Sequence, residues 1–417
     1  MWQRVSEQVL AGPSLAEIEA AREAVAQVAK VTPLESATFL GEIVGSAVYL
    51  KCENLQRTGS YKIRGAYNRL SRLTDAEKSR GVVAASAGNH AQGVAYAARE
   101  LGIRATIFMP IGVALPKLQA TKRYGAEVVL EGAIVDETLR AAARFAEETG
   151  AVLIPPFDHT DVVAGQGTLG LELLEQLPDV DTVIVPIGGG GLISGVASAL
   201  KQRARIEGRD IRIVGVQAAG AAPYPVSLAE GRPVEIVITP TIADGIAVSR
   251  PGVLNFDIIR HAVDDVVTVS DDETAQAMLL LLERAKLVVE PAGAVGVAAL
   301  LSGRITGELG TTAIILSGGN IDPLMLDRVI SHGLATSERY LKLRIPLPDR
   351  PGQLAHTAQL VASANANVVE VLHTRHGTGL QISEVELELH IETRGPEHAD
   401  EVIRTLRDAG YAPRVDF

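Results

Sequence analysis

The chain has 417 residues, a length that favours two or three domains over a single one. Hydrophobic residues make up 47% and charged residues 21%, a balance that indicates a globular protein and excludes an intrinsically disordered chain. The net charge of −11, with no block of Lys and Arg, argues against a nucleic-acid-binding protein.

Apolar strands alternate with amphipathic helices through most of the chain. This order predicts an α/β fold in which helices cover both faces of a parallel sheet. The predicted strands are 47–50, 81–85, 105–108, 128–130, 182–185, 211–216 and 313–316. The predicted helices are 61–73, 89–101, 116–124, 135–148 and 193–202.

The pattern changes at a polar segment with little periodicity, residues 331–339, which we interpret as a linker between residues 1–330 and 340–417. The predicted elements after it are, in order, a strand at 341–347, a helix at 353–363, strands at 367–374 and 382–391, a helix at 397–409 and a strand at 411–416. The order βαββαβ predicts a ferredoxin-like domain.

The predicted location is the cytoplasm. Cys52 is the single cysteine, so an intrachain disulfide is excluded, which fits a reducing compartment. Residues 1–10 lack the apolar stretch of a signal peptide, and no apolar run reaches the roughly 20 residues that span a bilayer. We therefore expect an enzyme of small molecules, with neither a membrane nor a nucleic acid as partner.

Lys62 stands at the start of a predicted helix, within the segment 58–66. A charged lysine opposes the helix dipole there, whereas a neutral lysine, joined to a ligand as a Schiff base, does not. Base chemistry would also require a lowered pKa. The alternative is a surface lysine that extends its ammonium into water.

The segment 85–93 follows a predicted buried strand and opens a helix, so its amide hydrogens can hold an anion such as an amino-acid carboxylate. Asn89 could cap this helix or donate to a ligand oxygen. For the side chain of His90, a core or capping role is favoured over catalysis. We expect the substrate site to comprise Ser86, Ala87, Gly88, Asn89 and His90.

Four successive glycines, Gly188 to Gly191, lie between a predicted strand and a predicted helix. Ordering four glycines is costly, and a phosphate held by bare N–H groups would compensate that cost. Gln217 stands where a dinucleotide-binding fold needs an acidic residue, which argues against an NAD-dependent dehydrogenase. The alternative is a flexible loop.

Ser317 follows another predicted strand, at the carboxyl edge where α/β proteins bind ligands. Its hydroxyl could face a heterocyclic nitrogen, or it could simply begin a turn.

These four motifs, in this order, resemble the fold-type II pyridoxal-phosphate (PLP) enzymes, the tryptophan synthase β-like group, and within it the threonine ammonia-lyases. The resemblance covers about residues 18–326. It implies two parallel-sheet subdomains, Lys62 as the Schiff-base lysine, Asn89 on the cofactor's ring oxygen and Ser317 on its ring nitrogen. It also implies a phosphate site at Gly188, Gly189, Gly190, Gly191 and Leu192. Tyr61 replaces the phenylalanine that usually precedes the lysine and keeps an aromatic ring beside the cofactor.

The resemblance implies that the chain deaminates L-threonine to 2-oxobutanoate and ammonia, with L-serine as a second substrate. Serine racemases of the same group are the nearest alternative, but they carry a serine where this chain has Ala87, which offers no transferable proton. Related racemases also bind a divalent cation through a glutamate where this chain has Gln217, so we predict no metal site.

The segment from about residue 340 resembles an ACT domain, a small module that commonly binds regulatory amino acids. The turn at 349–354, Asp-Arg-Pro-Gly-Gln-Leu, matches the turn after the first strand of that module. Such modules pair, so the resemblance implies a homo-oligomer, a dimer or a tetramer. The alternative for this segment is a purely structural or dimerising appendage. For the whole chain, a further alternative is a non-catalytic amino-acid sensor that uses the ACT domain for readout.

Overall fold

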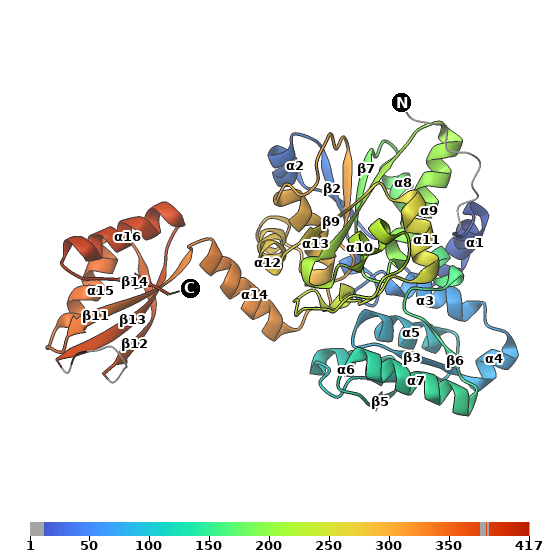
Figure 1. Ribbon diagram of the computed structural model, residues 1–417, viewed down its shortest axis with the longest axis horizontal. Coiled ribbons are helices and arrows are strands. Elements are labelled where there is room, and N and C mark those ends of the chain that lie inside the picture. The colour runs from blue at the N-terminus through green and yellow to red at the C-terminus, as the bar shows by residue number, and fades with distance from the viewer. Residues whose placement is uncertain (1–11, 376–380, 382, 417) are drawn as a thin grey trace. The chain divides into compact units, whose positions relative to one another are not determined.

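The computed structural model describes residues 12–375, 381 and 383–416, so the predictions for residues 1–10 and for residue 382 lie outside the described residues. The chain divides into two compact units, the first ending at Asp322 and the second beginning at Pro323 (Figure 1). The first unit contains two sheets and the second unit contains one.

The larger sheet of the first unit has six strands in the spatial order β1-β2-β10-β7-β8-β9. Five of them are parallel, as predicted, whereas the short edge strand β1 runs antiparallel to β2. A strand of three largely solvent-facing residues carries no apolar pattern, which is why the sequence did not reveal β1. The strands are β1 (Leu34–Ser36), β2 (Val48–Lys51), β7 (Thr182–Pro186), β8 (Arg212–Ala218), β9 (Asp265–Val269) and β10 (Thr312–Ile315).

Helices cover both faces of this sheet (Figure 1). On one face, apolar residues of β7, β8 and β10 form a core with α8, α9 and α11. On the other face α13 approaches so closely that a Cβ at Gly296 would lie 2.7 Å from Ile314. The helices of this part are α1 (Leu15–Val25), α2 (Thr38–Val44), α8 (Thr160–Gln176), α9 (Gly191–Glu207), α10 (Pro223–Glu230), α11 (Val253–Ala262), α12 (Asp271–Leu280) and α13 (Pro291–Leu301).

The smaller sheet of the first unit is fully parallel, in the order β5-β4-β3-β6. Helices α3 and α5 cover one face and α7 covers the other. The strands are β3 (Val82–Ala85), β4 (Ala105–Met109), β5 (Glu127–Leu130) and β6 (Val152–Leu153). The helices are α3 (Lys62–Ser71), α4 (Asp75–Arg80), α5 (Asn89–Glu100), α6 (Leu115–Arg123) and α7 (Val135–Thr149).

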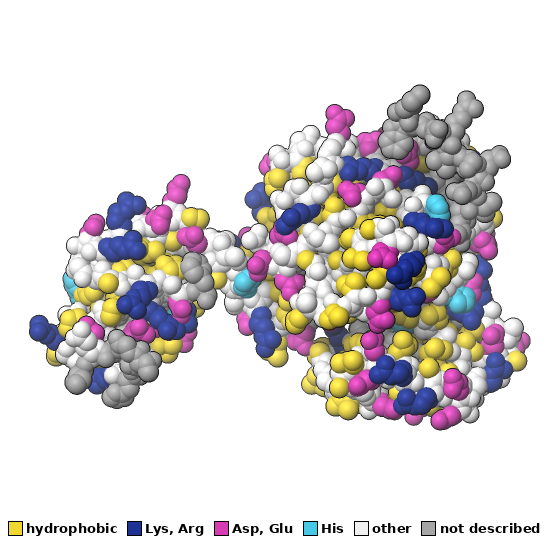
Figure 2. All heavy atoms as spheres, in the orientation of Figure 1, with side chains coloured by type: hydrophobic (Ala, Val, Ile, Leu, Met, Phe, Trp, Pro, Cys, Tyr) yellow, Lys and Arg dark blue, Asp and Glu magenta, His cyan; other side chains and the backbone are white. Residues whose placement is uncertain are grey.

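Short helical segments supply several connections of the first unit. They are the 3₁₀ turns η1 (Glu53–Leu55), η2 (Ala219–Ala221) and η3 (Asp244–Ile246), and the π-helical turn η4 (Leu281–Ala285). The face of this unit that Figure 2 shows carries acidic and basic side chains interspersed, without a continuous basic patch.

The second unit has a four-stranded antiparallel sheet in the order β12-β13-β11-β14, with α15 and α16 packed on its apolar face. This is the spatial order of a ferredoxin-like βαββαβ fold. Its elements are α14 (Pro323–Thr336), β11 (Tyr340–Pro348), α15 (Gln353–Ser363), β12 (Asn367–Thr374), β13 (Glu384–Glu392), α16 (Pro396–Asp408) and β14 (Arg414–Val415).

The structure differs from the predicted linker at residues 331–339. The first unit ends at Asp322, and residues 331–336 are the last part of helix α14. Ser331 and His332 are exposed on this helix, whereas Val329 and Gly333 are buried. The polar residues Ser331 and His332 therefore belong to the solvent face of a helix, and only residues 337–339 form a non-helical turn before β11.

Among the described residues, no helix is long and apolar enough to cross a membrane.

Candidate active site

A cavity of the first unit collects all of the predicted site residues. Its lining includes Tyr61, Lys62, Ser86, Ala87, Gly88, Asn89, His90, Gly188, Gly189, Gly190, Gly191, Leu192 and Ser317. These residues come from the carboxyl ends of β3, β7 and β10 and from the start of α3. The topology explains this convergence, because parallel strands bring the turns after them to one edge of a sheet.

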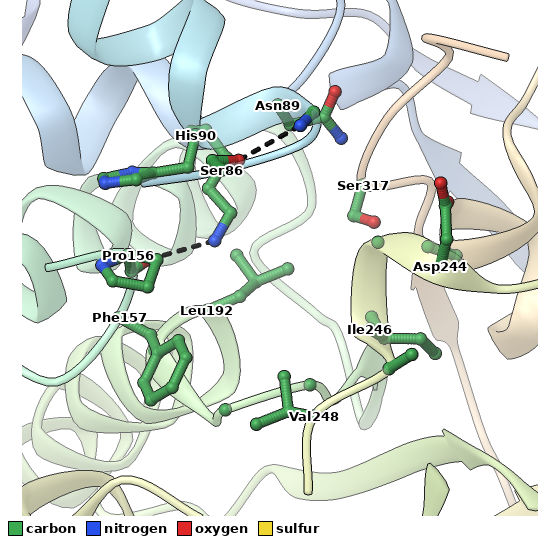
Figure 3. Close-up of a pocket in the computed structure, with 18 of the residues that line it drawn as sticks. Ser86, Asn89, His90, Pro156, Phe157, Leu192, Asp244, Ile246, Val248 and Ser317 are labelled. Carbon is green, nitrogen blue, oxygen red and sulfur yellow. Dashed lines mark hydrogen bonds between the residues drawn. The ribbon is translucent and has the colours of Figure 1, made fainter. Parts of the chain in front are cut away.

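Lys62 begins α3, which packs against both α5 and α8. Its Nζ donates a hydrogen bond of 3.0 Å to the carbonyl of Pro156, drawn in Figure 3. Burial lowers the pKa of Lys62 to about 8, against a weaker opposing effect of the Glu290 charge. A substantial neutral fraction near pH 8 is what an amine needs to act as a nucleophile or base.

Two helix N-termini face the cavity. Helix α5 begins at Asn89 and α9 begins at Gly191, each directly after a strand and a turn that line the cavity. Among the residues that the structure describes, no side chain caps either helix. Their first N–H groups are therefore suited to two anions, and the helix dipoles favour both.

The sequence allows two roles for the Asn89 side chain, capping the helix or donating to a ligand oxygen. In the structure it does not cap the helix. Its Nδ2 donates to Glu290 Oε1 at 2.6 Å, and its Oδ1 accepts from Asn320 Nδ2 at 2.7 Å. These two partners fix the orientation of the amide and leave its second N–H for another acceptor. Ser86 lies near it in Figure 3, where its hydroxyl accepts the N–H of Gly88 at 3.1 Å.

His90 is buried, and its Nε2 lies 3.0 Å from the carbonyl of Ile154, so that nitrogen carries the proton. Burial, with repulsion from Lys62 next, lowers the pKa of His90 to about 3. The imidazole is thus neutral and structural, in line with the predicted core role for its side chain.

The glycine run is closely surrounded by other residues, as expected of a turn that is shaped to hold a ligand. A Cβ at Gly189 would overlap the Phe157 ring, and one at Gly191 would lie 2.9 Å from Phe157 Cβ. Gly190 has φ of 100°, a left-handed conformation that favours glycine. These close contacts favour a turn of fixed shape over the flexible-loop alternative.

Several residues of the cavity were not predicted from the sequence. Lys117 of α6 and Asp244 of η3 form a 2.7 Å ion pair, and Phe157 follows β6. Glu290 is 4% exposed, immediately before α13, and burial raises its pKa to about 7. The Pro-Pro dipeptide at 155–156 and the Glu-Pro helix start at 290–291 are the local features that could have marked two of these segments.

No group of three or more His, Cys, Asp or Glu in the described part of the chain is arranged to hold a metal ion. The side-chain amide of Gln217 makes two hydrogen bonds within the protein. Its Oε1 accepts the Tyr224 N–H at 3.0 Å, and its Nε2 donates to the Ile187 carbonyl at 3.4 Å. The absence of a metal site stays a prediction.

The fold and the cavity define a class of protein with two α/β subdomains, a buried lysine of lowered pKa and two uncapped helix N-termini at the cavity. A family model described as "Pyridoxal-phosphate dependent enzyme" matches residues 25–318. The chain belongs to this family, and its cofactor is PLP. The residues of the cavity also suit this cofactor, because they include the Lys62 amine and a glycine turn whose N–H groups suit a phosphate.

Individual relatives indicate which enzymes of this family the chain resembles. The L-threonine ammonia-lyase of Thermotoga maritima is 46% identical over 402 residues, which cover 96% of this chain and 99% of that protein. The L-threonine dehydratase catabolic TdcB of Escherichia coli is 47% identical over 307 residues, 73% of this chain and 92% of that protein. Among solved structures, maize serine racemase matches with a TM-score of 0.70 and 38% identity, covering 78% of this chain and 99% of that chain.

Proposed function

We propose that this chain is a PLP-dependent L-threonine ammonia-lyase, which converts L-threonine to 2-oxobutanoate and ammonia and also acts on L-serine to give pyruvate. The observation that carries the proposal is the position of the Lys62 amine in a cavity with two uncapped helix N-termini. One N-terminus suits a phosphate and the other suits an amino-acid carboxylate. Relatives named for this activity span nearly the whole chain.

Different residues of the chain hold the cofactor, orient the substrate and remove the proton. Residues 188–192 would hold the cofactor's phosphate, Asn89 its ring oxygen and Ser317 its ring nitrogen. Bound PLP supplies an electron sink for the bond broken at the substrate's Cα. The loop at 86–90 orients the substrate carboxylate, and Lys62 Nζ removes the Cα proton. The Cα proton and the Cβ hydroxyl leave together as one water. One water is then taken up when the C–N bond of the dehydrated product is hydrolysed, so each threonine yields one 2-oxobutanoate and one ammonia.

Racemisation is the second candidate, because a serine racemase shares the fold. It requires a proton donor on the opposite face of Cα. Ala87 lines the cavity at the position where the racemase pattern has serine, and its methyl group cannot donate a proton. This favours elimination over racemisation.

The test is a product assay on the PLP-loaded protein with L-threonine and L-serine. We expect 2-oxobutanoate and pyruvate, each with one equivalent of ammonia, and almost no D-serine by chiral chromatography. D-serine formed at a rate comparable with pyruvate would overturn the proposed reaction in favour of racemisation. No keto acid from either substrate would favour an amino-acid sensor.

The second unit is proposed to be an ACT-type regulatory domain that binds an amino acid, within a homo-oligomer. Its supports are the strand order β12-β13-β11-β14 and the Asp349–Gly352 turn between β11 and α15. Since threonine deamination can feed isoleucine synthesis, isoleucine and valine are the first effectors to try. A cytoplasmic location is part of the same proposal.

A further inference from the structure

The carbonyl of Gly189, in the middle of the glycine run, accepts three hydrogen bonds. The donors are the N–H of Gly252 at 3.2 Å, Asn255 Nδ2 at 3.2 Å and the Tyr224 hydroxyl at 3.1 Å. They come from α10 and from the start of α11, both outside the loop. A carbonyl oxygen has two lone pairs, so three donors fix its direction firmly.

This anchoring decides where the next N–H points. In a planar trans peptide the C=O and the following N–H point in opposite directions. Because the Gly189 carbonyl is turned toward α10 and α11, the N–H of Gly190 is turned the other way, toward the cavity that residues 188–192 line. It joins the unpaired first N–H groups of α9 there. A carbonyl turned into the cavity would instead repel an anion.

The anchoring residues are themselves held in place. Tyr224 and Asn255 are both fully buried. The backbone N–H of Tyr224 donates to Gln217, whose Nε2 donates to Ile187, next to the loop. The Asp158 carboxylate accepts N–H groups at the start of α11, including that of Val253 at 2.9 Å.

The Tyr224 hydroxyl acts as a donor throughout the working pH range. Burial raises the pKa of Tyr224 well above its ordinary value, with the Asp158 charge acting in the same direction. The phenol therefore stays protonated.

We propose that Tyr224 and Asn255 are positioning residues that preset the glycine loop for the cofactor's phosphate, and so raise PLP affinity without touching the cofactor. Neither residue is part of the cavity lining. The inference rests on the proposed function in one respect, the placement of the PLP phosphate at residues 188–192.

The test compares PLP with pyridoxal, which lacks the phosphate, on cofactor-free protein. Tyr224→Phe removes only the hydroxyl, and we expect it to weaken PLP binding about five- to tenfold, the effect of one lost hydrogen bond. Pyridoxal binding should not change. At saturating PLP the kcat for threonine should stay within about twofold of wild type, because the loop is then held by its ligand.

Tyr67→Phe is the matched control. It also removes a hydroxyl from a buried tyrosine, one that donates to Gln27 at 3.1 Å and lies outside the cavity lining. We expect unchanged affinity for both ligands. Asn255→Ala is the second test variant and should also weaken PLP binding selectively, so the inference stays testable if one variant folds poorly.

Equal weakening of PLP and pyridoxal by Tyr224→Phe would overturn the inference, because the residue would then support the whole cavity. Unchanged PLP affinity in both Tyr224→Phe and Asn255→Ala would overturn it too. Failure of the proposed function has a different signature: a wild-type protein that binds PLP tightly but releases no keto acid from threonine.

Discussion

At the scale of single residues, Lys62 and Lys117 make a natural pair for comparison, because both line the cavity. The Lys62 ammonium donates to a neutral carbonyl, and burial lowers its pKa to about 8. Lys117 is paired with the Asp244 carboxylate at 2.7 Å. The ion pair holds the Lys117 amine on the Asp244 carboxylate, whereas the Lys62 amine has only a neutral partner, so Lys62 is the better placed nucleophile.

We therefore predict that Lys62→Ala abolishes keto-acid release and the visible absorbance of lysine-bound cofactor, with an unchanged far-UV circular dichroism spectrum. Lys117→Ala is the control and should still attach the cofactor, as judged by borohydride reduction and peptide mapping. Keto-acid release near the wild-type rate from folded Lys62→Ala would refute the assignment.

Glu290 provides a prediction about stability and pH. Its carboxyl faces Asn89, and the charges of Asp244, Lys117 and Lys62 act on it. Burial, reinforced by Asp244, raises its pKa from 4.5 to about 7. In the unfolded chain this group ionises at lower pH than in the folded protein, so its contribution to stability is complete below about pH 4.5 and is lost as the pH rises to about 7.

Glu290→Gln removes this titration. We expect the free energy of unfolding of the cofactor-free variant, relative to wild type, to rise between pH 5 and pH 8 by at most about 3 kcal/mol. Urea denaturation at both pH values measures it. A difference between variant and wild type that is the same at both pH values would show that Glu290 is ionised throughout.

At the scale of elements, the turn from β7 to α9 is the part most sensitive to added volume. A side chain at Gly189 would overlap Phe157, and Gly189→Val should weaken PLP binding about tenfold to a hundredfold, the usual cost of overpacking. Gly112→Val is the control, since a Cβ there meets no atom within 4 Å. Equilibrium titration with PLP measures both. Unchanged affinity in Gly189→Val would assign the loop another role.

At the scale of the whole molecule, the first unit holds the entire cavity and its own cores. We predict that a chain ending at Asp322 binds PLP and releases 2-oxobutanoate, but no longer responds to any amino acid that modulates the full-length protein. Steady-state assays with isoleucine and valine measure the response, and typical couplings of about 1–3 kcal/mol change apparent affinity severalfold or more.

An effector response that survives this truncation would place the regulatory site in the first unit. A full-length protein that responds to no amino acid would favour a dimerising role for the second unit.

Features that depend on neighbouring residues could be predicted from the amino-acid sequence alone. Glycine runs, helix starts and buried strands leave local patterns, so the turns carrying Lys62, Asn89, Gly188–Leu192 and Ser317 could be predicted, together with the elements around them. The parallel α/β fold and the PLP family followed from those motifs. The predicted end of the first domain was less accurate, because a polar helix face resembles a linker in composition.

Which side chains come into contact could be learned only from the packed structure. Glu290 reaches Asn89 across 201 positions of the chain, and Lys117 reaches Asp244 across 127. The same holds for Tyr224 and Asn255 on the Gly189 carbonyl, which approach it from 35 and 66 positions away. Such contacts leave no local periodicity, because they arise when separately formed strands and helices pack, and packing depends on the shape of the whole core.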